Sequence, residues 1–374
     1  MATTKVIPGV LDLNQANSES GLRMPTGTAY AAPPTVAEGM MRNDTSQSSL
    51  SSASTMQHYT GNNEWKNFVN IADTITTHFL VVAGGGSGAT FHGGGGGAGG
   101  YRTSYGTESP ITLSGGSMES TVSLSKSVAY TVTVGDGAAG VTSTTGANLS
   151  GNNGSDSTFS GSFTGSPITS TGGGAGSSYN TQTTPGTGGS GGGGGANNQT
   201  GAAAVSSPVV QGFAGGDGGQ NSNPFPPGGG GGAGSVGVNA TSGGGGNGGD
   251  GLENQITGAT GVFYAGGGGG GTFVSGSPGT GGSGVGGNGG PATLNTSGFD
   301  GTTNTGSGGG GANADSSNAT ITGAGGSGVI ILRYPNYYTA TYSAGAGGAA
   351  DAEVSTGTDK YIRITAGTGT VTFS

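Results

Sequence analysis

Runs of consecutive glycine constrain this chain more than any other feature. Glycine provides 93 of the 374 residues, and tracts occur at 93–97, 172–174, 191–195, 228–232, 243–246, 266–271 and 308–311. A glycine inside a helix costs about 1 kcal/mol relative to alanine, so the tracts argue against a helical bundle. Because glycine does not recur at every third position, the chain is not collagen either.

The tracts are consistent with either a flexible linker or an ordered glycine structure. Composition alone favours a linker. However, β-type apolar runs bracket the tracts at 78–83 and 328–334, and large apolar residues recur between them. A glycine run can form an extended helix with three residues per turn and no internal hydrogen bonds, so its backbone groups must bond to neighbours. The sequence therefore predicts packed polyglycine-II helices held by a backbone hydrogen-bond lattice.

We expect a mainly β protein with almost no α-helix. Residues 1–72 are predicted to form a small β-meander for attachment or oligomerisation. Residues 73–335 form the glycine-rich domain of polyglycine-II helices, framed by antiparallel strands. Residues 336–374 are predicted to form a C-terminal β-hairpin, with Gly367-Thr368-Gly369 as its turn.

Charge and cysteine usage exclude several functions. The chain has 9 Lys+Arg against 18 Asp+Glu, a net charge of −9, and no lysine or arginine between 127 and 332. Binding to nucleic acid needs basic patches, so it is not expected. Without cysteine there are no disulfides and no thiolate metal sites.

The N-terminal residues lack the apolar run of a signal peptide, and no apolar stretch reaches the ~20 residues of a membrane span. We expect synthesis in a cytoplasm and no membrane insertion.

Motifs for catalysis or cofactor binding are weak. Gly-x-Gly-x-x-Gly occurs often, but no convincing helix follows it, and no lysine follows a glycine as a P-loop requires. The Gly-x-Ser-x-Gly at 188–192 has no histidine after His92 to act as its base. The histidines His58, His78 and His92 lack metal-ligand spacing. We therefore expect no enzyme, no cofactor and no metal.

Acidic residues leave two alternatives open. Residues 245–252 match one copy of a calcium-binding nonapeptide, which would use Asp250 and Glu253, although a calcium β-helix needs tandem copies. A glycosidase needs two facing carboxylates, and the sequence singles out no pair.

Aromatic residues between the tracts are the candidates for receptor binding, because rigid aromatic faces are common at binding surfaces. The alternative is that they pack against the edges of the glycine layer. The candidates are Tyr179, Phe213, Phe225, Phe263, Tyr264, Phe273 and Phe299.

Two stretches resemble proteins of tailed phages. Residues 38–45, with 56–61 and Trp65, resemble a module of tail fibres and other virion appendages; its attachment candidates are Arg42, Asp44, Tyr59 and Trp65. FLVVAGGGSGA from residue 79, YTVTVGDGAAG from 130 and GGSGVIILRY from 325 are similar, in that order, to the glycine-rich domain of phage fibre and adhesin proteins.

The resemblance implies a virion structural protein. It implies a homo-oligomer, by expectation a trimer, that contacts other virion proteins through its N-terminal region. The glycine-rich domain would bind a host-surface glycan or protein without catalysis. Two alternatives stay open, namely a capsid-decorating fibre or fibre shaft with a purely structural role, and a polysaccharide-degrading spike.

The lattice hypothesis makes a prediction about substitutions. Valine at Gly268, in the middle of a tract, should place a Cβ between backbones and destabilise the fold. Gly298, expected in a loop, should tolerate the change better.

Overall fold

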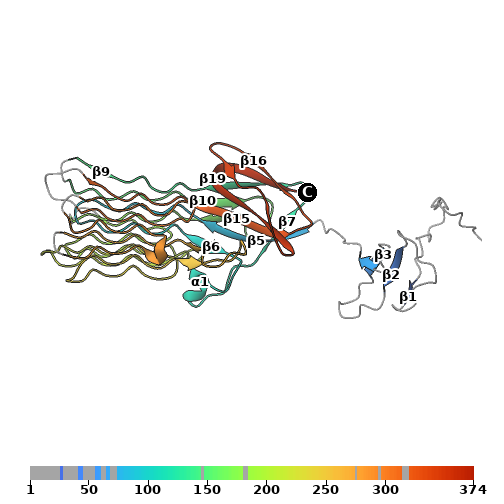
Figure 1. Ribbon diagram of the computed structural model, residues 1–374, viewed down its shortest axis with the longest axis horizontal. Helices are drawn as coiled ribbons and strands as arrows, with labels where there is room; N and C mark the ends of the chain where they lie inside the picture. The colour runs from blue at the N-terminus through green and yellow to red at the C-terminus, as the bar shows by residue number, and fades with distance from the viewer. Residues whose placement is uncertain are drawn as a thin grey trace, which may run out of the picture. The chain divides into compact units, whose positions relative to one another are not determined.

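The computed structural model describes residues 26–27, 41–44, 55–59 and 65–67, and then 74–374 except 145–146, 180–183, 274–275, 294–295 and 314–319. The chain divides into two compact units, residues 1–72 and 73–374. Within the described ranges, helix is confined to α1 (Pro110–Leu113) and the 3-10 turn η1 (Gly282–Gly284). The prediction of a mainly β protein is confirmed (Figure 1).

The first unit contains a four-stranded sheet in the order β1-β2-β3-β4. Its strands are β1 (Thr26–Gly27), β2 (Met41–Asp44), β3 (Thr55–Tyr59) and β4 (Trp65–Asn67). Strands β2, β3 and β4 form the predicted antiparallel meander, and β1 is parallel to β2. The attachment candidates lie on these strands. Arg42 and Asp44 are in β2, and Tyr59 pairs with Trp65 across β3 and β4.

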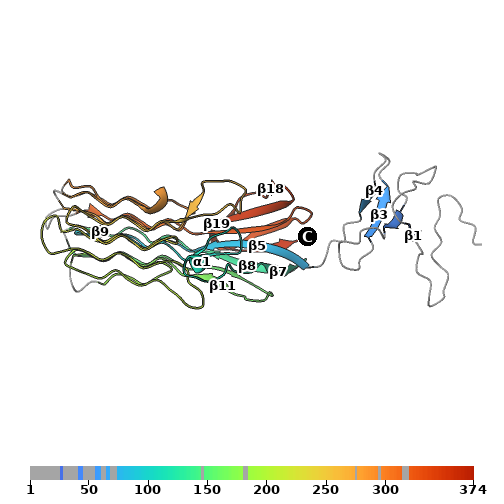
Figure 2. The same ribbon diagram turned by 90° about the horizontal axis from the view of Figure 1, so that it is seen from below.

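The second unit is built on a large sheet whose main path is β11-β10-β8-β19-β15-β5-β6, with β7 beside β5 and β16, β17 and β18 beside β19 (Figures 1 and 2). The strands are β5 (Thr74–Val82), β6 (Tyr101–Thr103), β7 (Val122–Ser125), β8 (Ala129–Val134), β10 (Ser157–Ser160), β11 (Ile168–Ser170), β15 (Val329–Pro335), β16 (Ala340–Ala344), β17 (Ala349–Ala350), β18 (Val354–Thr356) and β19 (Asp359–Phe373). Two small pairs complete the unit, β12 (Leu252–Glu253) with β13 (Phe263–Tyr264), and β9 (Thr142–Ser143) with β14 (Thr320–Ile321).

The apolar runs predicted as buried strands form the centre of this sheet. In β5, Phe79 and Val81 face one hydrophobic cluster, whereas Leu80 and Val82 face another. Strand β15 divides in the same way, because successive side chains of a strand point to opposite faces. Both faces of the sheet centre are therefore covered, which explains why these strands are continuously apolar rather than alternating.

The C-terminal hairpin is present, but its turn is not where the sequence indicated. The last residues paired between strands β18 and β19 are Thr356 and Asp359, so the chain reverses at 357–358. The Gly-Thr-Gly sequence lies inside β19. Gly367 has a φ of +61° and marks the point at which β19 passes from pairing with β15 to pairing with β8. A left-handed glycine here bends the strand without reversing it.

The glycine segments form polyglycine-II helices, as their hydrogen bonds show. Successive N–H groups from residue 84 point to three different segments, and every third residue returns to the same one. Gly84, Ser87 and Thr90 donate to Ser155, Asn152 and Leu149; Gly85 and Gly88 donate to Gly326 and Gly323; Gly86 and Ala89 donate to Gly97 and Gly94. This period matches three residues per turn.

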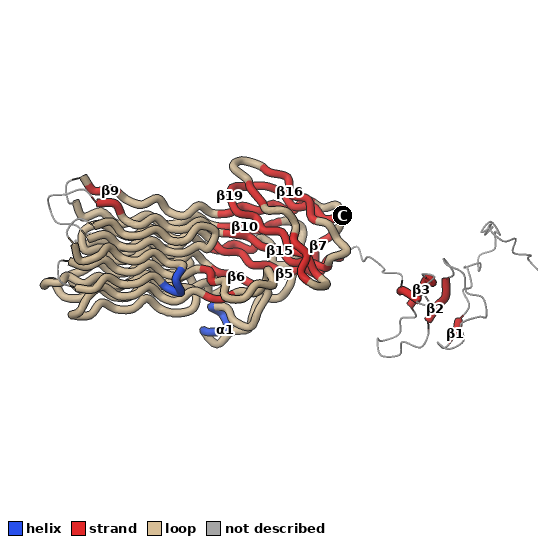
Figure 3. Tube along the Cα trace, in the orientation of Figure 1, coloured by secondary structure: helices blue, strands red, loops and turns tan. Residues whose placement is uncertain are grey.

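Residues 93–100 form the central run of the lattice. Their N–H groups donate to runs 171–177, 228–231 and 306–312, and their carbonyls accept from runs 83–89, 190–193 and 268–271. In the described part of the chain, the central run is thus surrounded by six others, which run side by side in Figure 3. A core of this kind is held by backbone hydrogen bonds rather than by apolar side chains.

Close packing of the runs is possible only without Cβ atoms. A Cβ on Gly95 would lie 2.0 Å from the carbonyl oxygen of Gly268, and one on Gly268 would lie 2.1 Å from that of Gly309. The expectation that Gly298 sits in an open loop is wrong. A Cβ there would lie 2.0 Å from the oxygen of Gly310, because residue 298 belongs to a packed run.

Candidate binding site

One set of the turns between glycine runs lies at the end of the lattice remote from the main sheet, which we call the outer end. Run 83–90 continues directly from β5, and run 93–100 leads directly back into β6, so the turn at 91–92 lies at this end. Described turns at 197–199, 219–225 and 241–244 also belong to it. Figure 1 shows the runs extending away from the labelled strands of the sheet.

Five aromatic rings from four separate turns meet at the outer end, and we call them the aromatic cap. His92 is central: its ring stacks on Phe225, with 5.0 Å between centroids, and meets Phe273 edge-on at 4.8 Å. The ring centroid of Tyr179 lies 5.9 Å from those of both Phe91 and His92. The structure therefore brings together three of the predicted candidates, Tyr179, Phe225 and Phe273.

Sequence reasoning missed the other two members of the cap. Phe91 and His92 have φ angles of +51° and +53°, which side-chain-bearing residues rarely adopt. They form the tight turn into the central run. The available signal was their position, because a bulky pair interrupts the glycine-rich stretch where the chain must reverse.

His92 acts as an uncharged ring in this cap. Burial lowers the pKa of His92 from its usual 6.5 to about 4. Only 4% of the residue is exposed, and its Nδ1 has no hydrogen-bond partner among the described residues. The imidazole is therefore neutral at pH 7, and aromatic packing is its main interaction.

The four remaining aromatic candidates lie outside the cap. Tyr264, in β13, is 3% exposed within the second hydrophobic cluster, so it is not available to a receptor. Its neighbour Phe263 and the more distant Phe213 are half-buried. Phe299 is 56% exposed, and its backbone N–H donates to the carbonyl of Asn288.

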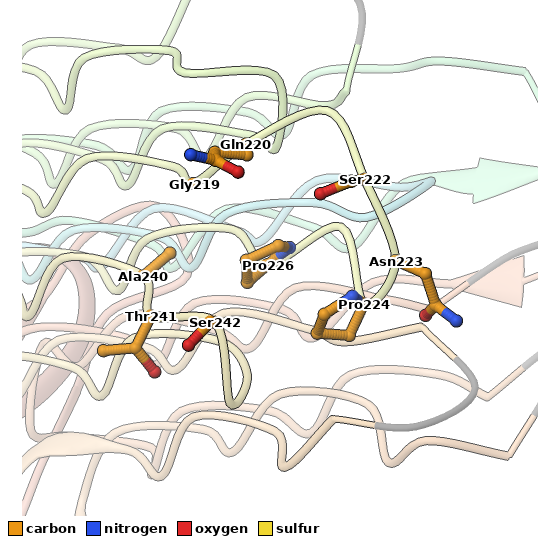
Figure 4. Close-up of a pocket in the computed structure, with 9 residues that line it drawn as sticks. All are labelled: Gly219, Gln220, Ser222, Asn223, Pro224, Pro226, Ala240, Thr241 and Ser242. Carbon is orange, nitrogen blue, oxygen red and sulfur yellow. The ribbon is translucent and has the colours of Figure 1, made fainter.

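A pocket of about 290 Å³ opens at the outer end, between turns 219–226 and 240–242 (Figure 4). Its polar lining consists of Gln220, Ser222, Asn223, Thr241 and Ser242, and no lining residue carries a charge. Uncharged amides and hydroxyls can donate and accept hydrogen bonds, but they offer no opposite charge for an ion pair with a charged ligand.

The loop that forms one wall of this pocket is fixed in place. Gly219 donates to the carbonyl of Pro226 at 2.7 Å, which closes the base of the loop. Phe225 donates to Ser222 at 2.7 Å, and Phe273 donates to Pro224 at 3.1 Å. Because the Phe225 ring is held in the aromatic cap, the two prolines beside it are anchored as well.

A second pocket, of about 490 Å³, lies beside β6 and β12 and is lined by Tyr105, Gly106, Thr107, Glu108, Glu253 and Gln255. It brings two carboxylates to one cavity. Glu253 stabilises its own loop, because its Oε1 accepts hydrogen bonds from the N–H of Gly261 at 2.7 Å and from the side-chain amide of Gln255 at 3.3 Å.

Three further acidic side chains cap backbone N–H groups of the glycine runs. Asp156, Asp217 and Asp300 accept hydrogen bonds at 2.7–2.8 Å from the N–H groups of Gly172, Gly201 and Ala324. These side chains take the place of a main-chain carbonyl, because none of the three N–H groups donates to one. Asp250 contacts Ser283, at 3.4 Å. Within the described ranges, no three His, Asp or Glu residues gather closely enough to hold a metal ion.

Comparison with known proteins identifies one relationship. A family model described as a glycine-rich domain matches residues 62–335. No curated protein and no solved structure matches the chain significantly. In the part of the chain described here, no helix has the length and apolar character needed to cross a membrane.

Proposed function

The chain belongs to the glycine-rich domain family. From the resemblance of its sequence to phage fibre and adhesin proteins, we propose that it is a structural protein of a phage tail fibre or other virion appendage. In this proposal, its outer end binds the host surface without catalysis. The observation that supports this proposal is a division of roles within the second unit. Backbone hydrogen bonds hold the lattice together, and a set of turns lies at its outer end.

This division between a structural lattice and surface turns suits a receptor-binding protein. Since the lattice is held by main-chain groups, turn residues outside the aromatic cap can vary without disturbing it. The turns supply the half-buried rings of Tyr179, Phe225 and Phe273, which expose part of their surface beside an uncharged pocket. Aromatic groups with part of their surface exposed are typical anchors of interfaces.

The first unit would attach the protein to the virion. Arg42, Asp44, Tyr59 and Trp65 lie on the strands of its small sheet and are the candidates for contacts with other virion proteins or with further copies of the chain. A trimer is the expected assembly, from the resemblance to phage fibres.

The direct test is immunogold labelling of intact particles, with an antibody raised against residues 77–335. Gold at the tips of tail fibres is the expected result. Gold over the capsid would favour a decorating fibre, and unlabelled particles would contradict a virion role altogether. Purified protein should also compete with particles for adsorption to host cells.

A further inference from the structure

We propose that the pocket between turns 219–226 and 240–242 binds a neutral sugar unit of a host-surface glycan. The inference rests on the proposed function, because it names the ligand class that the outer end would recognise. It begins from the lining of the pocket and from the electrostatics of the surrounding chain.

The lining combines polar groups with apolar surface, as a pyranose ring does. Gln220, Ser222 and Ser242 offer amide and hydroxyl groups, whereas Pro224, Pro226 and Ala240 offer apolar surface. A sugar ring presents hydroxyls at its edge and C–H groups on its faces, so both kinds of lining can be used. The volume of about 290 Å³ lies at the lower end of ligand pockets, which suits one sugar rather than a polymer segment.

The charge distribution disfavours anionic ligands. No lysine or arginine occurs between residues 127 and 332, a stretch that includes every lining residue, and the whole chain carries a net charge of −9. Phosphate, sulfate or carboxylate groups would meet no cation in the pocket and a repulsive field around it. Neutral hexoses and N-acetylhexosamines escape this penalty.

The pocket is also shaped before any ligand arrives. Its wall is closed by the Gly219–Pro226 hydrogen bond and anchored by the ring of Phe225 in the aromatic cap. The cap thus holds Pro224 and Pro226 as a rigid face. A preformed site loses less conformational entropy on binding, which matters for a ligand that makes few contacts.

The test is saturation-transfer NMR on the full chain, with methyl glycosides of neutral hexoses and N-acetylhexosamines as probes and the methyl glycoside of a sialic acid as the anionic comparison. A neutral glycoside should give a signal and the anionic one should not. Gln220→Ala should weaken the affinity roughly five- to tenfold, as expected for one lost hydrogen bond.

Gln255→Ala is the matched control, because Gln255 is also an exposed glutamine and lines the second pocket. It should leave binding unchanged, and both variants should keep the melting temperature of the parent. Absence of signal from every neutral glycoside, a stronger signal from the anionic probe, or loss of binding only in the Gln255 variant would each overturn the proposal.

Failure here can be separated from failure of the proposed function. If no glycoside binds but gold labels fibre tips and the protein blocks adsorption, the receptor is of another class and only the sugar pocket is wrong. If a glycoside binds but particles remain unlabelled, the pocket stands and the virion role does not.

Discussion

The imidazole of His92 stacks on the ring of Phe225, with 5.0 Å between the ring centroids and 14° between the planes. The two residues are far apart in the sequence and belong to different turns. Their contact holds the loop that carries the pocket-lining residues Pro224 and Pro226 against the turn that begins the central glycine run. The stability of the lattice end and the shape of the pocket are therefore linked through one stacked pair.

Titration of His92 should make stability depend on pH. Its pKa is about 4 in the folded protein against 6.5 normally, so between these values the unfolded chain binds a proton that the folded chain does not. The free energy of unfolding should be highest above pH 6.5 and should fall as the pH drops towards 4. The difference between the two pKa values corresponds to a loss of at most about 3 kcal/mol in the free energy of unfolding.

Urea denaturation across this pH range checks the prediction, with His92→Phe as the comparison. That variant keeps a ring in the cap but has no group to protonate. The free energy of unfolding of the parent minus that of the variant should increase as the pH rises from 4 to 6.5. A constant difference over this range would show that His92 does not supply the dependence.

Substitution inside the lattice should be far more damaging than substitution at its surface. Gly268→Val should lower the free energy of unfolding by more than about 4 kcal/mol, because even the Cβ would lie 2.1 Å from the oxygen of Gly309. Gly243→Ala is the control, since the nearest atom to its Cβ would be the hydroxyl of Thr241, at 3.6 Å. It should change stability by less than about 0.5 kcal/mol.

Thermal unfolding of the two variants decides this point. A Gly268 variant that melts with the parent would refute close backbone packing at that position. Gly298→Val should now behave like the Gly268 variant, in contrast to what its sequence context indicated.

Removing the Phe225 ring should weaken both stability and adsorption. Phe225→Ala should cost about 2 kcal/mol, less than a fully buried phenylalanine, because the ring is half-buried. It should also reduce competition for adsorption, since Pro224 and Pro226 lose their anchor. Phe299→Ala, which truncates an exposed ring, should cost less than about 0.5 kcal/mol. Equal effects of the two variants on adsorption would argue against a special role for the cap.

The carboxylates of the second pocket should have no catalytic role. Incubation of the protein with host polysaccharide should release no reducing ends, and Glu108→Gln should leave competition for adsorption unchanged. Release of reducing ends that Glu108→Gln abolishes would instead support the polysaccharide-degrading spike, because two carboxylates facing one cavity are what such hydrolysis requires.

The amino-acid sequence determined the type of core. Glycine tracts bracketed by the apolar runs that became β5 and β15 leave few structures in which every backbone group is satisfied, and packed polyglycine-II helices are one of them. The strands could be predicted because their signal is local, in β-branched and apolar residues that follow one another along the chain.

Only the tertiary structure decided which runs are neighbours, and with them the site. The partners of each glycine run are distant in the sequence, and glycines carry no side chains that could indicate a pairing. For this reason the sequence could not show that Tyr179, Phe225 and Phe273 meet around His92, that Tyr264 is buried in the sheet, or that Gly298 is packed. A lattice held by identical backbone groups leaves its neighbour relationships to be fixed by the lengths of the runs and turns acting together in three dimensions.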